Sequence, residues 1–201
     1  MSERIKIRLP IVVEGKYDKS TILSIFDTTV VTLGGFGIFN SKEKQALIRK
    51  IAKDGIIVLT DSDGAGKMIR SFLNGIIPKD KIYNLYIPKI EGKEKRKSAP
   101  SKEGFLGVEG IGREELVRIL SPFAVENTDG GQRSVKSAEM ITKVDFYMDK
   151  LTGSENSSQL RDALALHFSL PTGMTPNALL EALNIITDKE GYRAAVDKLK
   201  A

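Results

Sequence analysis

The chain has 201 residues, of which 41% are hydrophobic, and a formal net charge of +5. This length allows one domain with an appendage or two small domains. No apolar stretch approaches the length of a membrane span, and the absence of cysteine excludes disulfides and thiolate zinc sites. A chain without cysteine fits a reducing cytoplasm, so we expect a cytoplasmic protein with no membrane partner.

Strands and helices are predicted to alternate along the first part of the chain. Apolar runs rich in β-branched residues are typical of buried strands, and apolar residues every three or four positions are typical of helices. The strands are predicted over residues 5–13, 28–33, 56–60 and 82–87, and the helices over 18–26, 41–53, 65–75 and 113–120. This alternation predicts an α/β fold with a mostly parallel sheet and helices on both of its faces.

The pattern changes after the last of these helices. The Asn-, Asp- and Gly-rich residues 124–134 are typical of a linker, which separates an α/β domain at 1–123 from the residues at 135–201. Only helical periodicity follows, so a small all-helical C-terminal domain is expected. Within it, Thr175 precedes a proline and is a good helix start. His167 falls beside an apolar face, which favours a core or interface role.

Two acidic motifs follow two of the predicted strands. Glu14 follows the apolar run 11–13, and Asp61 and Asp63 follow the run 56–60. Because ligands of open α/β sheets bind at the carboxyl ends of the strands, these three carboxylates should converge. Crowded carboxylates repel one another unless a hard cation neutralises them, and Mg²⁺ is the usual cation where phosphate is the substrate. The sequence therefore predicts a Mg²⁺ site.

These three acids are the candidate catalytic residues and metal ligands. Glu14 is the candidate general acid/base, because a carboxylate held among others has a raised proton affinity. Asp61 and Asp63 are expected to bind Mg²⁺. Asp18 lies four residues after Glu14 and is a candidate supporting ligand, although it could equally stabilise a helix N-terminus. Glu109 is a further candidate ligand at the same edge of the sheet.

Basic residues gather in the first part of the chain. Residues 135–201 hold 8 Lys or Arg and 9 Asp or Glu, a net charge of −1, which leaves a net charge of +6 on residues 1–134. This favours a surface that faces a polyanion, the alternative being an ordinary solvated surface. Part of the charge lies in a basic loop predicted at 89–107. The candidate contacts with such a polyanion are Lys16, Lys67, Arg70, Lys93, Lys95, Arg96, Lys97 and Lys102.

The two acidic motifs resemble the TOPRIM signature, in which one strand ends in Glu-Gly and a later strand ends in Asp-x-Asp. Over nearly its whole length, the chain is similar to the 5S ribosomal RNA maturation ribonucleases, the ribonuclease M5 family. The similar segments are residues 12–15, 59–63, 67–70, 87–89, 107–109, 151–153 and 160–164. The chain departs from that family at Ser62, where proline is common, and at residues 64–66, which look more like those of a primase.

The resemblance implies a TOPRIM-type fold and a Mg²⁺-dependent endoribonuclease with Glu14 as its acid/base. It implies a structured RNA substrate, a 5S ribosomal RNA precursor cut in both strands of a stem. A ribosomal protein bound to that RNA is implied as a partner. Two alternatives stay open: a primase-like nucleotidyl transferase, and a non-catalytic protein that binds RNA or assists ribosome assembly.

Overall fold

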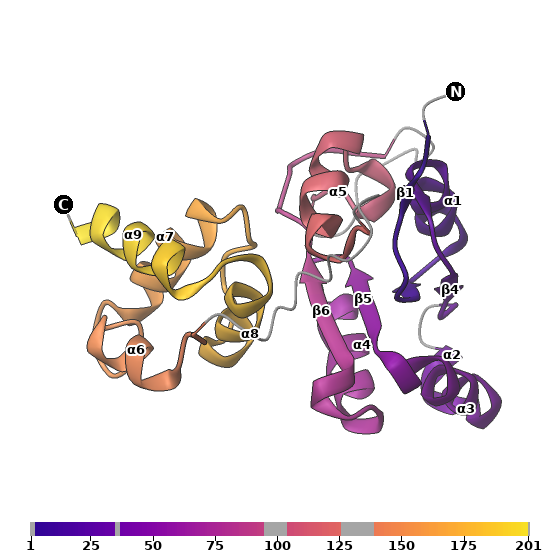
Figure 1. Ribbon diagram of the computed structural model, residues 1–201, viewed down its shortest axis with the longest axis horizontal. Coiled ribbons are helices and arrows are strands. Elements are labelled where there is room, and N and C mark those ends of the chain that lie inside the picture. The colour runs from indigo at the N-terminus through magenta and orange to yellow at the C-terminus, as the bar shows by residue number, and fades with distance from the viewer. Residues whose placement is uncertain (1–2, 35–36, 95–103, 126–138, 201) are drawn as a thin grey trace. The chain divides into compact units, whose positions relative to one another are not determined.

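The computed structural model divides into two compact units, residues 1–132 and 133–201 (Figure 1). It describes residues 3–34, 37–94, 104–125 and 139–200. Most of the predicted linker lies outside these stretches, so the linker stays a prediction. The same is true of four of the predicted basic contacts: Lys95, Arg96, Lys97 and Lys102.

The first unit is built around a parallel four-stranded sheet with the strand order β4-β2-β5-β6. Strands β1 and β3 form a separate two-stranded parallel sheet. The two central strands, β2 and β5, are buried at every position, which explains their unbroken apolar sequences. The strands are β1 (Ile5–Lys6), β2 (Ile11–Val13), β3 (Phe26–Asp27), β4 (Val30–Thr32), β5 (Ile56–Thr60) and β6 (Ile82–Tyr86).

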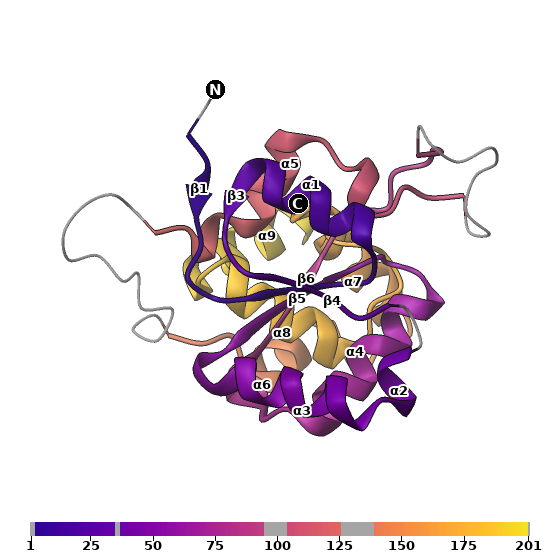
Figure 2. The same cartoon turned by 90° about the vertical axis from the view of Figure 1, so that its right-hand side faces the viewer.

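Helices cover both faces of the sheet, with α1 and α5 on one face and α2, α3 and α4 on the other (Figure 2). On the second face, Val12 and Val58 of the sheet pack in one cluster with Ile48 of α3 and Ile69 of α4. The helices are α1 (Lys16–Ile25), α2 (Gly37–Asn40), α3 (Lys42–Ile51), α4 (Gly64–Ile76) and α5 (Arg113–Leu120). Short 3₁₀ helices are η1 (Ala52–Asp54), η2 (Lys79–Lys81), η3 (Val108–Gly110) and η4 (Ser121–Phe123).

The predicted α/β fold with a mostly parallel sheet is confirmed, and its architecture is consistent with the TOPRIM type. The single strand predicted over 5–13 is wrong. Pro10 lacks the N–H that a continuing strand would donate, and the chain splits into β1 and β2 on either side of it. The first half turns to other partners, since β1 pairs with β3 and Ile7 forms a bridge with Ala124.

Among the described residues of the second unit, helices are the only regular secondary structure, as predicted: α6 (Lys143–Met148), α7 (Ser157–His167), α8 (Pro176–Ile186) and α9 (Lys189–Lys200). Helix α8 begins where Thr175 accepts a hydrogen bond of 3.3 Å from the backbone N–H of Ala178. Of the core or interface role expected of His167, the core role is wrong and the interface role stays a prediction. This residue ends α7 on its exposed side, because the buried stripe of the helix runs through Leu164 and Ala165.

No helix within the described stretches of either unit is long and apolar enough to cross a membrane.

Candidate active site

Glu14 lies at the carboxyl end of β2 and is tied to the end of the neighbouring strand β5. One of its carboxylate oxygens, Oε1, accepts a hydrogen bond of 3.2 Å from the backbone N–H of Asp61. Burial, reinforced by the negative charges of Asp61 and Asp63, raises the pKa of Glu14 to about 7. The convergence that the sequence predicted for these acids is therefore found.

Asp61 follows β5 and faces the segment that leads into η3. Its Oδ1 accepts a hydrogen bond of 2.9 Å from the backbone N–H of Val108. The preceding residue, Gly107, packs closely on the same carboxylate, since a Cβ atom built there would lie 2.5 Å from Oδ2 of Asp61. A side chain at position 107 would displace Asp61, so the glycine is required for the shape of the site.

Asp63 is the N-cap of α4. Its Oδ1 accepts a hydrogen bond of 2.8 Å from the backbone N–H of Gly66, which satisfies a donor that the first helical turn leaves without a partner. Gly66 itself packs against the strand end, because a Cβ atom there would lie 2.1 Å from the carbonyl oxygen of Asp61. The helix can start this close to β5 only with glycine at that position.

Asp18 and Glu109 join the same group of acids. Asp18 accepts a hydrogen bond of 3.0 Å from the backbone N–H of Gly15 and a second from the backbone N–H of Glu109. Burial, with the charges of Asp61 and Glu109, raises the pKa of Asp18 to about 6. Asp18 therefore caps α1, one of the two roles considered from the sequence, and adds charge to the acidic group, while its role as a metal ligand stays a prediction.

The acids lie close enough for their charges to affect one another, but they are not arranged as the ligands of a metal ion. Within the described residues, no three His, Asp or Glu side chains form a group that could hold a metal ion as they stand. Each of these acids accepts a hydrogen bond from a backbone N–H with one carboxylate oxygen, which fixes the orientation of the side chains of Glu14, Asp61 and Asp63. Their chemistry nevertheless suits Mg²⁺, which prefers hard carboxylate oxygens. After burial, the raised pKa of Glu14 reflects the negative charges of Asp61 and Asp63 at this edge.

The RNA contact predicted for Arg70 is wrong. This side chain is only 5% exposed and lies beneath the site rather than on its surface. Its guanidinium donates to the carbonyl oxygens of Thr60 (2.9 Å) and Asp61 (3.2 Å) at the end of β5, and of Leu85 (2.9 Å) in β6. It also lies 4.2 Å from the ring centre of Tyr86. Arg70 thus holds the two strand ends together.

Three other predicted contacts are exposed, as binding to phosphate requires: Lys16, Lys67 and Lys93. Lys16 begins α1 directly after the Glu14 motif, and Lys67 lies in the first turn of α4 after Asp63. Their roles in RNA binding remain predictions.

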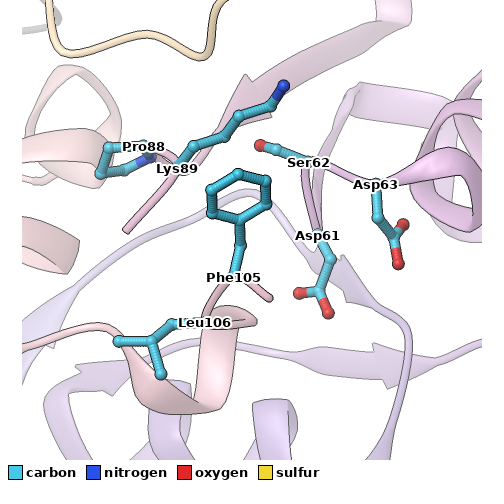
Figure 3. Close-up of a pocket in the computed structure, with 7 residues that line it drawn as sticks. All are labelled: Asp61, Ser62, Asp63, Pro88, Lys89, Phe105 and Leu106. Atoms are coloured by element: carbon cyan, nitrogen blue, oxygen red, sulfur yellow. The ribbon is translucent and has the colours of Figure 1, made fainter. Parts of the chain in front are cut away.

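A hollow adjoins Asp61 and Asp63, with residues of the next strand connection on its other side (Figure 3). Its lining residues are Asp61, Ser62, Asp63, Pro88, Lys89, Phe105 and Leu106. Lys89 and Phe105 were not among the candidates from the sequence. Lys89 follows the end of β6, so the rule that placed Glu14 and Asp61 at the carboxyl edge would also have found it.

Sequence comparison finds relatives over most of the chain, although no protein-family model matches it. A ribonuclease M5 from Fusobacterium nucleatum is 31% identical over 166 residues, which cover 82% of this chain and 81% of the relative. A ribonuclease M5 from Clostridium botulinum is 31% identical over 193 residues, covering 95% and 96%. One from Borreliella burgdorferi is 30% identical over 187 residues, covering 92% and 90%. The chain therefore belongs to the ribonuclease M5 family.

Proposed function

We propose that this protein is a Mg²⁺-dependent endoribonuclease that cuts structured RNA and matures a 5S ribosomal RNA precursor. The observation that carries the proposal is the hydrogen-bonded pair Glu14 and Asp61 at adjacent strand ends, with Asp63 beside them. Family membership supports it, since the relatives are named as ribonucleases.

The acids divide the chemical work between them. A group with a pKa near 7 can give up and take back a proton at neutral pH, so Glu14 is suited to be the general acid/base of phosphodiester cleavage. Asp61, Asp63 and Glu14 would hold Mg²⁺, whose chemistry when bound is to neutralise charge on the scissile phosphate. The backbone N–H of Val108 keeps Asp61 turned toward the site.

The basic residues would hold the RNA. Double-stranded RNA is recognised mostly through its shape and its phosphates. The exposed lysines beside the two motifs, Lys16 and Lys67, suit phosphates near the cut. The basic loop, of which Lys93 is described, suits a more distant stretch. We further propose that a ribosomal protein on the same RNA assists binding, and that the enzyme acts in the cytoplasm.

Incubation with the organism's own 5S precursor and Mg²⁺, with mapping of the cuts, tests this function. Replacement of Glu14 by Gln should lower the cleavage rate about 10²–10⁴-fold while RNA affinity stays nearly unchanged, because the amide cannot carry a proton but keeps an oxygen for the N–H of Asp61 and for Mg²⁺. Asp80→Asn is a matched control. It neutralises an exposed carboxylate in η2, which precedes β6 at the opposite edge of the sheet.

Three results would contradict the proposal. Full activity in Glu14→Gln would remove Glu14 from catalysis. Cleavage that persists in excess EDTA would remove the metal. Extension of a primed template with nucleoside triphosphates, without cleavage of any RNA, would identify a nucleotidyl transferase instead.

A further inference from the structure

The hollow beside the acids has two chemically different sides. Asp61 and Asp63 form the acidic side, at the end of β5 (Figure 3). Lys89 and Phe105 dominate the other side, which pairs a cation with an aromatic ring. The proposed roles of the acids do not use this second side.

Lys89 is held in place rather than free in solvent. Its Nζ lies 5.6 Å from the ring centre of Phe105, within the range of a cation–π contact. In Figure 3 its side chain runs above the ring, and its amino group and the carboxylate of Asp61 point in opposite directions. The backbone beside it is also fixed, because the hydroxyl of Ser62 donates a 2.7 Å hydrogen bond to the carbonyl of Ile87. The cation is therefore presented in a defined position.

Phe105 is fixed by the same segment that orients Asp61. It forms a β-bridge with Glu91, and the N–H of Leu106 donates to the carbonyl of Ile90 (2.8 Å). Two residues further on, the N–H of Val108 donates to Asp61. The aromatic ring and the catalytic carboxylate are thus joined by three residues of hydrogen-bonded backbone. A ligand that contacts the ring is therefore held at a fixed position relative to the carboxylates.

We propose that Lys89 and Phe105 form the subsite for the nucleotide that adjoins the scissile phosphate, with Lys89 on its phosphate and Phe105 against its ribose. This inference rests on the proposed endoribonuclease function. An RNA strand alternates anionic phosphates with riboses that have an apolar face, and in a duplex these are the groups offered to a protein. With one phosphate of the strand bound at Asp61 and Asp63, the neighbouring sugar and phosphate would lie on the Lys89 side of the hollow.

Replacing Lys89 and replacing Phe105 should affect the salt dependence of RNA binding differently. The affinity of full-length protein for the 5S precursor stem is measured at several salt concentrations, in a Glu14→Gln background so that the RNA stays intact. Lys89→Met should weaken binding several-fold and flatten the plot of log affinity against log salt by about 0.7–0.9, the share of one phosphate contact. Phe105→Leu should weaken binding at all salt concentrations without changing that slope.

Matched controls separate this subsite from general effects. Lys79→Met removes an exposed lysine in η2 at the opposite edge of the sheet, and Phe123→Leu removes a ring that packs on Tyr83. Neither should change the affinity or its salt dependence. Melting temperatures of all variants show whether each remains folded.

Chemical changes in the RNA then locate the contact. Single phosphates of the stem are replaced, one at a time, by a neutral methylphosphonate. At one position, next to the cut made by the unsubstituted enzyme, the penalty of Lys89→Met should vanish, because the partner charge is already gone. At the other positions the penalty should persist.

Several outcomes would overturn the subsite. One is a Lys89→Met variant that binds RNA like Lys79→Met, whether or not its melting temperature falls. Another is a penalty that persists with every methylphosphonate. A third is Lys89-dependent binding of a nucleoside triphosphate that is tighter than that of the stem. Because binding is measured without cleavage, these results are distinct from failure of the wild-type enzyme to cut RNA, which would instead refute the proposed function.

Discussion

Gly107 leaves no room for a side chain, because Asp61 occupies the space that a Cβ atom would need. We predict that Gly107→Ala lowers the cleavage rate at least tenfold, since Asp61 must move away from the hydrogen bond with Val108. Gly75→Ala is the control, because no atom other than those of the neighbouring backbone of α4 lies within 4 Å of its Cβ position. That change should be neutral or stabilise the helix by about 0.5–1 kcal/mol. The cleavage rates and melting temperatures of both variants are measured. Equal cleavage rates would mean that the close contact between Gly107 and Asp61 is unimportant for catalysis.

The raised pKa values of Glu14 and Asp18 predict how stability depends on pH. Both carboxyls bind protons more tightly in the folded protein than in the unfolded chain, with pKa values of about 7 and about 6. The folded state therefore takes up protons as the pH falls from about 8 to 5, and stability rises in the same direction. The melting temperature in EDTA should be higher at pH 5.5 than at pH 8.

The replacement Glu14→Gln isolates one of these groups, because the amide does not titrate. Its melting temperature should change less between pH 8 and pH 5.5 than that of the wild type. Asp145 has a lowered pKa and opposes this trend only under more acidic conditions. An identical pH dependence in both proteins would show that Glu14 ionises normally in the folded state.

At the scale of the elements, sequence prediction succeeded where the signals are local. Strand β5 was predicted over 56–60, its observed bounds, because Gly55 precedes an apolar run that ends at a charged residue. Helix α5 was likewise predicted within its observed bounds. The pairing of Ile7 with Ala124 could not be predicted, because the two residues are far apart in the chain and carry no motif.

In the site, too, the features that depend on nearby residues could be predicted and those that depend on packing between distant residues could not. Glu14 and Asp61 could be predicted, because each follows a strand of recognisable composition. The burial of Arg70 could not, because Lys67 lies one turn away and has a similar sequence environment. Only the packing of α4 on the sheet shows that Arg70 points inward and Lys67 outward. The hydrogen bond from the N–H of Val108 to Asp61 could not be predicted either, since every residue except proline has such a donor.

Arg70 should therefore contribute to stability far more than its neighbour on the helix surface. Arg70→Met leaves two buried carbonyl acceptors and one partly buried acceptor without their donor, at a cost of about 1–3 kcal/mol for each buried one. We predict a loss of about 3 kcal/mol or more in the free energy of unfolding, measured by urea denaturation. The control Lys67→Met should change it by less than about 0.5 kcal/mol. Similar values for the two variants would show that the clamp between β5 and β6 is not important for stability.

At the scale of the whole molecule, charge and chemistry are unequally divided between the two units. The acids of the site all belong to the first unit, whereas the second unit, residues 133–201, holds 9 Lys or Arg and 9 Asp or Glu, a net charge of 0. A segment with so little positive charge adds little non-specific attraction to phosphate. We therefore expect the second unit to influence which RNA is chosen, by reading RNA shape or by contacting a protein already bound to it.

Removal of residues 133–201 tests this division of labour. The shortened protein should still bind Mg²⁺ and cut RNA weakly, because Glu14, Asp61 and Asp63 keep their hydrogen bonds within the first unit. Its preference for the 5S precursor over an unrelated stem should fall, since what remains is the basic surface, which binds phosphates without regard to sequence. Cleavage of both stems by the full-length and shortened proteins is compared after circular dichroism has shown that the latter is folded. Undiminished discrimination by the shortened protein would assign the second unit to stability or to another task.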